Sequence, residues 1–232
     1  MKQSNTKCSE AGFTIAELMV AMTVTLVMIG LTSALLAGSF SIRTRENQRT
    51  EALADTQRGL NLMTREIANS GYALDDNGIV EGDSGDQSIR VRANLNATAG
   101  ETTSNSSTDR DEDIKYFLYT ENGFSYIVRL DVNTAAQQMI LANRVDALKF
   151  HYYPDKVTYT SGACDIDISS VRDAYGNPAG EVAQKAGAKY VVMTVCVNLP
   201  AVSSPGAPGY QPASKVQLTS DIALRNAELG TY

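Results

Sequence analysis

An apolar run from Phe13 to Ile42 constrains the fold of this chain more than any other feature. One formal charge lies inside the run, the carboxylate of Glu17. The run exceeds the roughly 20 residues that a membrane-spanning helix needs, so it is predicted to cross a bilayer. An ionisable side chain costs on the order of 2.5 to 3.5 kcal/mol at the centre of such a helix, and Glu17 is therefore expected to have a function.

The residues that open this run resemble a known processing signal. Gly12-Phe13-Thr14, with Glu17 as the fifth residue counted from Phe13, is similar to the class III signal of type IV pilins and type II secretion pseudopilins. The resemblance implies that a prepilin peptidase cleaves between Gly12 and Phe13 and methylates the new amine of Phe13. It also implies that Glu17 neutralises the Phe13 ammonium of a neighbouring subunit, because paired charges in hydrocarbon cost far less than separate ones. The alternative is that Glu17 is a snorkelling acid in a plain membrane anchor.

Length and charge suit an anchored, exported domain. The 232 residues carry a net charge of −6, which favours one membrane segment and one domain of about 150 to 190 residues. A polar leader, Met1 to Gly12, precedes the apolar run, which is the reverse of the order in an ordinary secretory signal peptide. Nucleic-acid binding is not expected, since such binders usually carry a basic surface.

Three cysteines are present, and two of them are predicted to pair. Cys8 lies in the leader, which leaves Cys164 and Cys196 in the mature chain. An even pair in an exported domain favours a disulfide, which would contribute roughly 3 to 4 kcal/mol on the chain-entropy description. The alternative is two free buried thiols. Two cysteines and the single His151 do not form a recognisable tetrahedral ligand set, so neither a metal nor another cofactor is expected.

Small residues recur every four positions in the apolar run, at Gly30, Ala34 and Gly38. They fall on one helical face, where small side chains allow another helix to approach closely, so the face is a candidate packing seam. Equally, glycine and alanine are simply common in membrane helices.

The helix is predicted to continue beyond the apolar run as an amphipathic segment over residues 43–70. Apolar residues recur there every seven positions, and Asn69-Ser70-Gly71 is the first candidate stop. Gly59 lies inside this segment and indicates a bend or a close contact. The recurring positions are Leu53, Leu60 and Ile67, with Thr56 and Met63 as companions.

Residues 71–110 are predicted to be mostly loop, and a series of strands is predicted to follow. The acidic groups Asp75–Gly78 and Asp109–Asp113 could hold calcium, but their spacing does not match an EF-hand and solvated loops are favoured. Pro154–Ala188 is interpreted as an irregular excursion tied to the sheet by Cys164. The predicted strands are Ser88–Ala93, Ile114–Thr120, Phe124–Leu130, Met139–Arg144, Ala147–Tyr153, Lys189–Leu199 and Lys215–Leu224.

Three further segments resemble the PilW-like minor pilins and the J-type minor pseudopilins: Met63–Tyr72, Val145–Tyr153 and Ile222–Asn226. The resemblance implies an α+β, type IV pilin-like fold, with one long N-terminal helix packed on a mainly antiparallel β-sheet head. The domains would be a leader (1–12), a membrane or filament-core half-helix (13–42), an amphipathic half-helix (43–70) and a globular head (71–232). It implies a single-pass protein of the bacterial inner membrane with a periplasmic head, which then enters a filament at the cell surface.

The sequence contains no recognisable catalytic constellation, so an enzyme is not expected. His151, which lies in a strand-like segment, is interpreted as structural. The leading hypothesis is a minor pilin that initiates or caps a type IV pilus, with other minor and major pilins, the prepilin peptidase and the inner-membrane assembly platform as partners. The alternatives are a minor pseudopilin of type II secretion and a pilus-tip adhesin or ligand-binding subunit.

Overall fold

A computed structural model describes residues 12–96, 107–141 and 144–227. The chain divides into two units, Met1–Arg45 with Ala201–Pro212, and Glu46–Pro200 with Ala213–Tyr232. We refer to the first as the N-terminal unit and to the second as the head. Most of the predicted leader, and residues 97–106 of the predicted loop 71–110, lie outside the described residues.

One helix, α1 (Ile15–Ala68), accounts for most of the N-terminal sequence and is 54 residues long. It has an acid, Glu17, in its first turn and a base, Arg65, in its last turn, which complements the helix dipole. The sequence predicted an end near Ser70, two residues later. The chain leaves the helix through Gly71, whose positive φ of 75° brings its backbone so close to Asp76 that an added Cβ would lie 2.5 Å from the Asp76 carbonyl oxygen.

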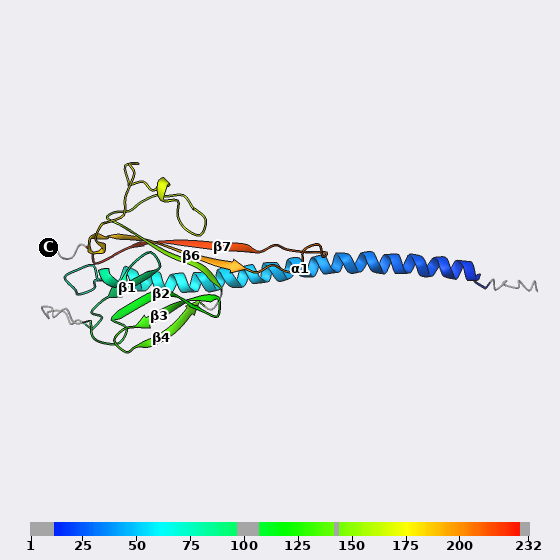
Figure 1. Ribbon diagram of the computed structural model, residues 1–232, viewed down its shortest axis with the longest axis horizontal. Helices are drawn as coiled ribbons and strands as arrows, with labels where there is room; N and C mark the ends of the chain where they lie inside the picture. The colour runs from blue at the N-terminus through cyan, green and yellow to red at the C-terminus, as the bar shows by residue number, and fades with distance from the viewer. Residues whose placement is uncertain (1–11, 97–106, 142–143, 228–232) are drawn as a thin grey trace, which may run out of the picture. The chain divides into compact units, whose positions relative to one another are not determined.

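The head contains two antiparallel sheets (Figure 1). The sequence predicted the strands but did not divide them between two sheets. All named strand pairs are antiparallel, and the N-terminal and C-terminal strands of the head belong to different sheets. The first sheet has the order β1 (Ser88–Arg92), β2 (Asp113–Glu121), β3 (Phe124–Asp131), β4 (Ala136–Leu141). The second has the order β5 (Val145–Tyr153), β6 (Tyr190–Leu199), β7 (Ser214–Ala223).

The strand predictions differ from the structure mainly at β4. The predicted strand Met139–Arg144 begins three residues too late, because β4 runs from Ala136 to Leu141; residues 142–143 of the prediction lie outside the described residues. β4 is an edge strand whose first four residues are exposed, so it lacks the alternation by which a half-buried strand is recognised. By contrast, the β2–β3 hairpin turns at Asn122-Gly123, both with positive φ, as its sequence indicates.

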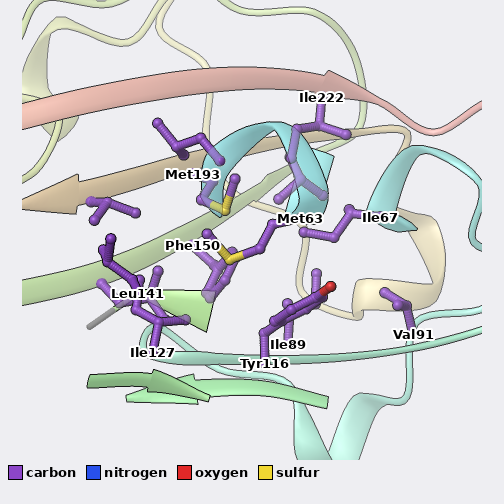
Figure 2. Close-up of a cluster of buried hydrophobic side chains, with 14 of the residues drawn as sticks. Met63, Ile67, Ile89, Val91, Tyr116, Ile127, Leu141, Phe150, Met193 and Ile222 are labelled. Atoms are coloured by element: carbon purple, nitrogen blue, oxygen red, sulfur yellow. The ribbon is translucent and has the colours of Figure 1, made fainter. Parts of the chain in front are cut away.

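The C-terminal part of α1 packs against both sheets of the head (Figure 2). Met63 and Ile67 are fully buried, and they lie between side chains of the first sheet, such as Tyr116, and of the second, such as Ile222. This is the face that the seven-residue spacing predicted. Gly59 is buried on the same part of the helix, and a Cβ placed there would lie 3.7 Å from the Ile140 carbonyl oxygen, so it marks a close approach to β4.

The excursion between β5 and β6 is irregular, as predicted, but it has an apolar cluster of its own. It contains two 3-10 turns, Ile168–Ser170 and Lys185–Gly187. Its cluster consists of residues from the excursion and from the adjoining ends of β5 and β6: Tyr153, Val157, Ile166, Val171, Tyr190 and Val192. The excursion therefore folds onto the second sheet as a packed layer.

Candidate functional site

The first turn of α1 holds the one acid of the apolar run. The Thr14 N–H and the Thr14 hydroxyl both donate to Glu17 Oε2, each at 2.9 Å. The Glu17 N–H in turn donates to Thr14 Oγ1 at 3.3 Å. This reciprocal pair is a capping box, which satisfies N–H groups that a helix start leaves without partners. The Thr14-x-x-Glu17 spacing was readable in the sequence, but an argument from charge alone missed it.

The bond predicted to be cleaved lies just before this cap. Gly12 and Phe13 are both exposed, and the Phe13 side chain retains 89% of its accessible surface. Among the residues that the structure describes, no heavy atom lies within 4 Å of a Cβ built on Gly12, apart from its neighbours in the chain. The structure is therefore compatible with access of a peptidase to this bond, and cleavage remains a prediction.

The apolar run forms a continuous exposed surface on α1. Every large apolar side chain from Phe13 to Ile42 is more than half exposed in the isolated chain. α1 is the one helix, among the described residues, that is long and apolar enough to cross a membrane, with a mean hydropathy of 2.1 over its best window. A continuous apolar surface of this size requires a cover of lipid or of other apolar helices.

The comparison with known proteins agrees with this geometry. Residues 7–33, which include Gly12, Phe13 and Glu17, match the family described as the prokaryotic N-terminal methylation motif. The match lies in the N-terminal segment and includes each residue of the predicted processing signal.

A solved structure of a type IV-like pilin from Thermus thermophilus is similar to this chain with a TM-score of 0.41 and 10% identity, over 75% of this chain and 97% of that one. A likeness of this size carries no argument about function. No curated protein matches the sequence.

The predicted packing seam of α1 is only partly engaged within the chain. Gly30 and Ala34 are exposed, whereas Gly38 is half-buried. Gly38 lies beneath Gly209, so closely that a Cβ on Gly209 would lie 2.7 Å from the Gly38 Cα. Packing of this face on a neighbouring subunit remains a prediction.

The two cysteines of the predicted bridge form a disulfide in the structure, with their Cα atoms 5.2 Å apart. Cys196 is fully buried in β6, and Cys164 belongs to the excursion. The bridge therefore ties the excursion to the central strand of the second sheet. Asp146 lies beside the two sulfur atoms, but sulfurs engaged in a disulfide are not thiolate ligands, so this group does not resemble a metal centre.

His151 is held between two carboxylates that sequence reasoning did not connect to it. Its Nε2 lies 2.6 Å from Asp165 Oδ1, and its Nδ1 lies 2.7 Å from Glu181 Oε1. Burial alone would lower the pKa of His151, but the two hydrogen bonds outweigh burial and raise this pKa above its ordinary value of 6.5. Both ring nitrogens face carboxylate oxygens, and only the imidazolium form can donate to both of them. In that form the side chain fastens the excursion to β5. The structural interpretation of His151 is thus supported by its contacts.

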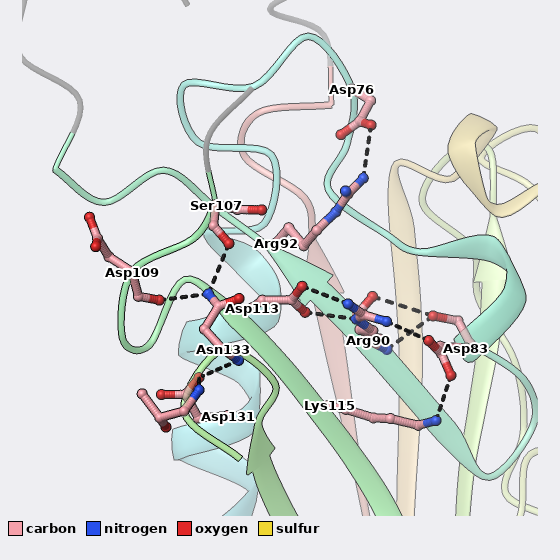
Figure 3. A network of polar contacts seen from close by, with 12 residues as sticks. Asp76, Asp83, Arg90, Arg92, Ser107, Asp109, Asp113, Lys115, Asp131 and Asn133 are labelled. Carbon is pink, nitrogen blue, oxygen red and sulfur yellow. Dashed lines mark hydrogen bonds and ion pairs between the residues drawn. The ribbon is translucent and has the colours of Figure 1, made fainter. Parts of the chain in front are cut away.

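Carboxylates from both acidic segments that could have been calcium ligands, such as Asp76 and Asp113, pair with arginines of the head (Figure 3). Arg90 donates to both oxygens of Asp113 at 2.7 Å and also pairs with Asp83. Lys115 donates to the second oxygen of Asp83, and these bonds lower the pKa of Asp83. A solvated loop was therefore the wrong description of Asp113, which is buried at the start of β2.

A related cluster fixes the loop that precedes β2. Burial would raise the pKa of Asp131, but N–H donors from Asp111, Asn133 and Thr134 lower it. Glu112 is also buried, and its side chain accepts from the N–H groups of Leu95 and Asp109. These carboxylates therefore hold the loop in place by accepting hydrogen bonds from backbone N–H groups of the head.

A polar link connects α1 to the first sheet. Glu66 accepts hydrogen bonds from the buried Tyr116 hydroxyl and from Arg129 Nε, the latter at 3.0 Å. Arg129 also donates to Asp111 at 2.8 Å. Burial and the nearby Glu66 charge raise the pKa of Tyr116, so this hydroxyl stays protonated and donates. A cleft of about 490 Å³ opens beside this link, lined by residues that include Arg65 and Glu112.

Proposed function

We propose that the protein is a minor pilin that takes part in initiating or capping a type IV pilus. The observation that carries this proposal is the exposed apolar surface of α1, which begins at a processing motif and contains a single acid. The head has a complete core of its own, whereas the apolar run has large side chains that require a cover. In a subunit with these properties, lipid covers the apolar part of α1 before assembly, and the helices of other subunits cover it in the filament.

In this proposal, a prepilin peptidase removes the leader after Gly12 and methylates Phe13. The Glu17 carboxylate then neutralises the Phe13 ammonium of a neighbouring pilin as the helices come together. Leaving one of two buried opposite charges without its partner costs about 3 to 5 kcal/mol, which gives this contact a strong influence on docking. The head lies in the periplasm before assembly, and the partners are other pilins and the inner-membrane assembly platform.

The capping box offers a second role for Glu17, and two variants separate the roles. Glu17→Gln removes the charge but retains a side-chain oxygen that can accept from Thr14. Thr14→Val removes the capping hydroxyl but leaves the charge of Glu17. If neutralisation is the function, Glu17→Gln should enter the membrane and be processed, yet be recruited poorly into filaments, while Thr14→Val should be recruited nearly normally.

The measurement is the amount of each variant in sheared filaments relative to the amount in the inner membrane. Glu46→Gln is the matched control, because Glu46 is an exposed acid of the same helix outside the apolar run. Normal recruitment of Glu17→Gln, together with poor recruitment of Thr14→Val, would assign Glu17 to capping and refute the neutralising role.

The N-terminal motif is shared by pilins and by pseudopilins of type II secretion, so a second assay must separate these machines. Deletion of the protein should abolish or reduce surface pili and leave secretion of type II substrates unchanged. Loss of secretion with normal pili would favour the pseudopilin alternative instead.

A further inference from the structure

The loop that joins β6 to β7 belongs to the N-terminal unit and is seated on α1 (Figure 1). Gly209 is in backbone contact with Gly38, as described above, and a Cβ on Gly209 would also lie 3.0 Å from Ser41 Oγ. The Ser203 and Ser41 hydroxyls form a hydrogen bond of 3.2 Å. Arg45 donates to the Pro212 carbonyl oxygen. We call this segment, Ala201–Pro212, the collar loop.

The collar loop contacts α1 where the apolar run ends: Gly38 and Ser41 lie inside the run, and Arg45 lies three residues beyond it. We call the contact of the loop with Gly38 its seat. Gly38 is four residues before Ile42, which ends the run, so it lies about 6 Å along the helix axis from Ile42 at 1.5 Å per residue. The helix from Ile15 to Ala37 spans roughly 33 Å, whereas the hydrocarbon core of a bilayer is about 30 Å thick. A helix that crosses the bilayer therefore has enough length before Gly38, and the seat falls where the hydrocarbon ends and the headgroups begin.

The composition of the collar loop suits that depth. No charged residue occurs from Tyr190 to Ser214, a range that contains the whole loop. Pro205 and Pro208 are exposed and have no N–H group that would need a partner. Tyr210 is half-buried, and tyrosine is enriched at the membrane–water boundary.

Some backbone N–H and carbonyl groups of the collar loop form hydrogen bonds with each other. Val202 and Gln211 exchange two backbone hydrogen bonds of 3.0 Å each. The Ala207 N–H donates to the Ser204 carbonyl, and the Tyr210 N–H donates to the Ala207 carbonyl. Non-helical backbone near lipid is tolerated only where its polar groups have such partners.

Basic residues flank the seat on the far side from the apolar run. Arg43 is exposed directly after Ile42, and Arg49 follows on the same helix. Arginine side chains at the end of a membrane helix interact favourably with anionic headgroups. We propose that the collar loop rests in the headgroup region of the membrane that α1 crosses and sets the depth at which the helix is held. This inference rests on the membrane anchoring that the proposed function requires.

The experiment uses the full chain in vesicles of phosphatidylcholine and phosphatidylglycerol, with a polarity-sensitive fluorophore on one introduced cysteine. Cys8→Ser is the background, and non-reducing conditions keep Cys164 and Cys196 in their disulfide. Ser204→Cys reports on the collar loop, Val27→Cys on the apolar run, and Ala174→Cys, in a loop of the head, is the control. Lipids with nitroxides in the headgroup or deep in the acyl chain serve as quenchers.

The label at Ser204 is expected to shift to the blue and to be quenched several-fold more by headgroup nitroxides than the label at Ala174. The label at Val27 should be quenched most by deep nitroxides. If Val27 is quenched as expected but Ser204 behaves like Ala174, the collar inference is overturned while anchoring stands. If Val27 escapes quenching, the anchoring itself is refuted.

A pair of glycine variants tests whether the seat on α1 places the loop. Gly209 and Gly206 both have positive φ, 79° and 86°, so a side chain is strained at either position. A Cβ at Gly206 meets no atom within 4 Å, whereas a Cβ at Gly209 collides with Gly38. Gly209→Val should therefore lose headgroup quenching at Ser204, and Gly206→Val should keep it. Equal quenching in the two variants would contradict the role of the seat.

Discussion

Replacing His151 by glutamine is expected to remove a pH-dependent part of the stability of the head. In the native head the imidazolium donates to Asp165 and to Glu181, at 2.6 and 2.7 Å, and its side chain is only 5% exposed. Glutamine can donate through its amide nitrogen alone and carries no charge. The variant therefore keeps at most part of the connection between β5 and the excursion.

The magnitude follows from two charge-assisted hydrogen bonds. Each contributes about 1.5 to 3 kcal/mol, and burial of the imidazolium offsets part of that sum, so a net loss of about 2 kcal/mol is expected in acid. For a domain of this size, that corresponds to a decrease in Tm of about 4 to 8 °C. Because the pKa of His151 is raised in the folded state, this contribution is complete below 6.5 and is lost as pH rises through the folded-state pKa.

The assay is thermal unfolding of a head fragment that begins at Glu46, from about pH 5.5 to about pH 9. Both apolar clusters lie within this fragment, so its core is complete without residues 12–45. The wild-type and variant curves should differ in acid and converge at alkaline pH. His151 is the one histidine of the sequence, so NMR titration of an untagged fragment gives its pKa directly. A pKa at or below 6.5, or a pH dependence that survives in His151→Gln, would refute the reasoning.

Three other predictions concern the head. Met63→Ala should reduce the free energy of unfolding by about 2 to 5 kcal/mol, because Met63 is fully buried between the sheets. In chemical denaturation, the control Met139→Ala on the exposed edge strand should change this free energy by less than about 0.5 kcal/mol. Cys164→Ser should lower the stability of the oxidised head by about 2 to 5 kcal/mol, and a reducing agent should then have no further effect on unfolding. Acid should also destabilise the head below about pH 4. The pKa of Asp83 is lower in the folded head than its ordinary value of 3.8, so ionised Asp83 contributes stability above pH 3.8, and this contribution is lost as pH falls through the folded-state pKa. In Asp83→Asn this part of the acid response should be absent.

The secondary structure was largely predictable because it depends on local patterns. The spacing of Leu60 and Ile67 predicted the buried face of the helix, and Asn122-Gly123 predicted the hairpin. The predicted start of β4 was wrong because an exposed edge strand has no alternation of buried and exposed residues by which its ends can be recognised. The division into two sheets depends on pairing between strands far apart in the sequence, which periodicity does not report.

The candidate site was predictable at its N-terminal end, where the motif and the residues that carry it are contiguous. Other contacts were not, because they join distant segments. His151 meets Glu181 across a loop without regular structure, and Gly38 meets Gly209 from the opposite part of the chain. The acidic segment that leads into β2 resembled a loop because the arginine that pairs with Asp113 lies on another strand.

The most direct test of the central claim is the mass of the N-terminal peptide of this protein recovered from sheared surface filaments. We predict a peptide that begins at Phe13 and carries one methyl group on its amine, which would show that the apolar helix is processed and built into the filament as a pilin helix. A filament-borne protein that retains the leader residues before Phe13 would contradict the claim.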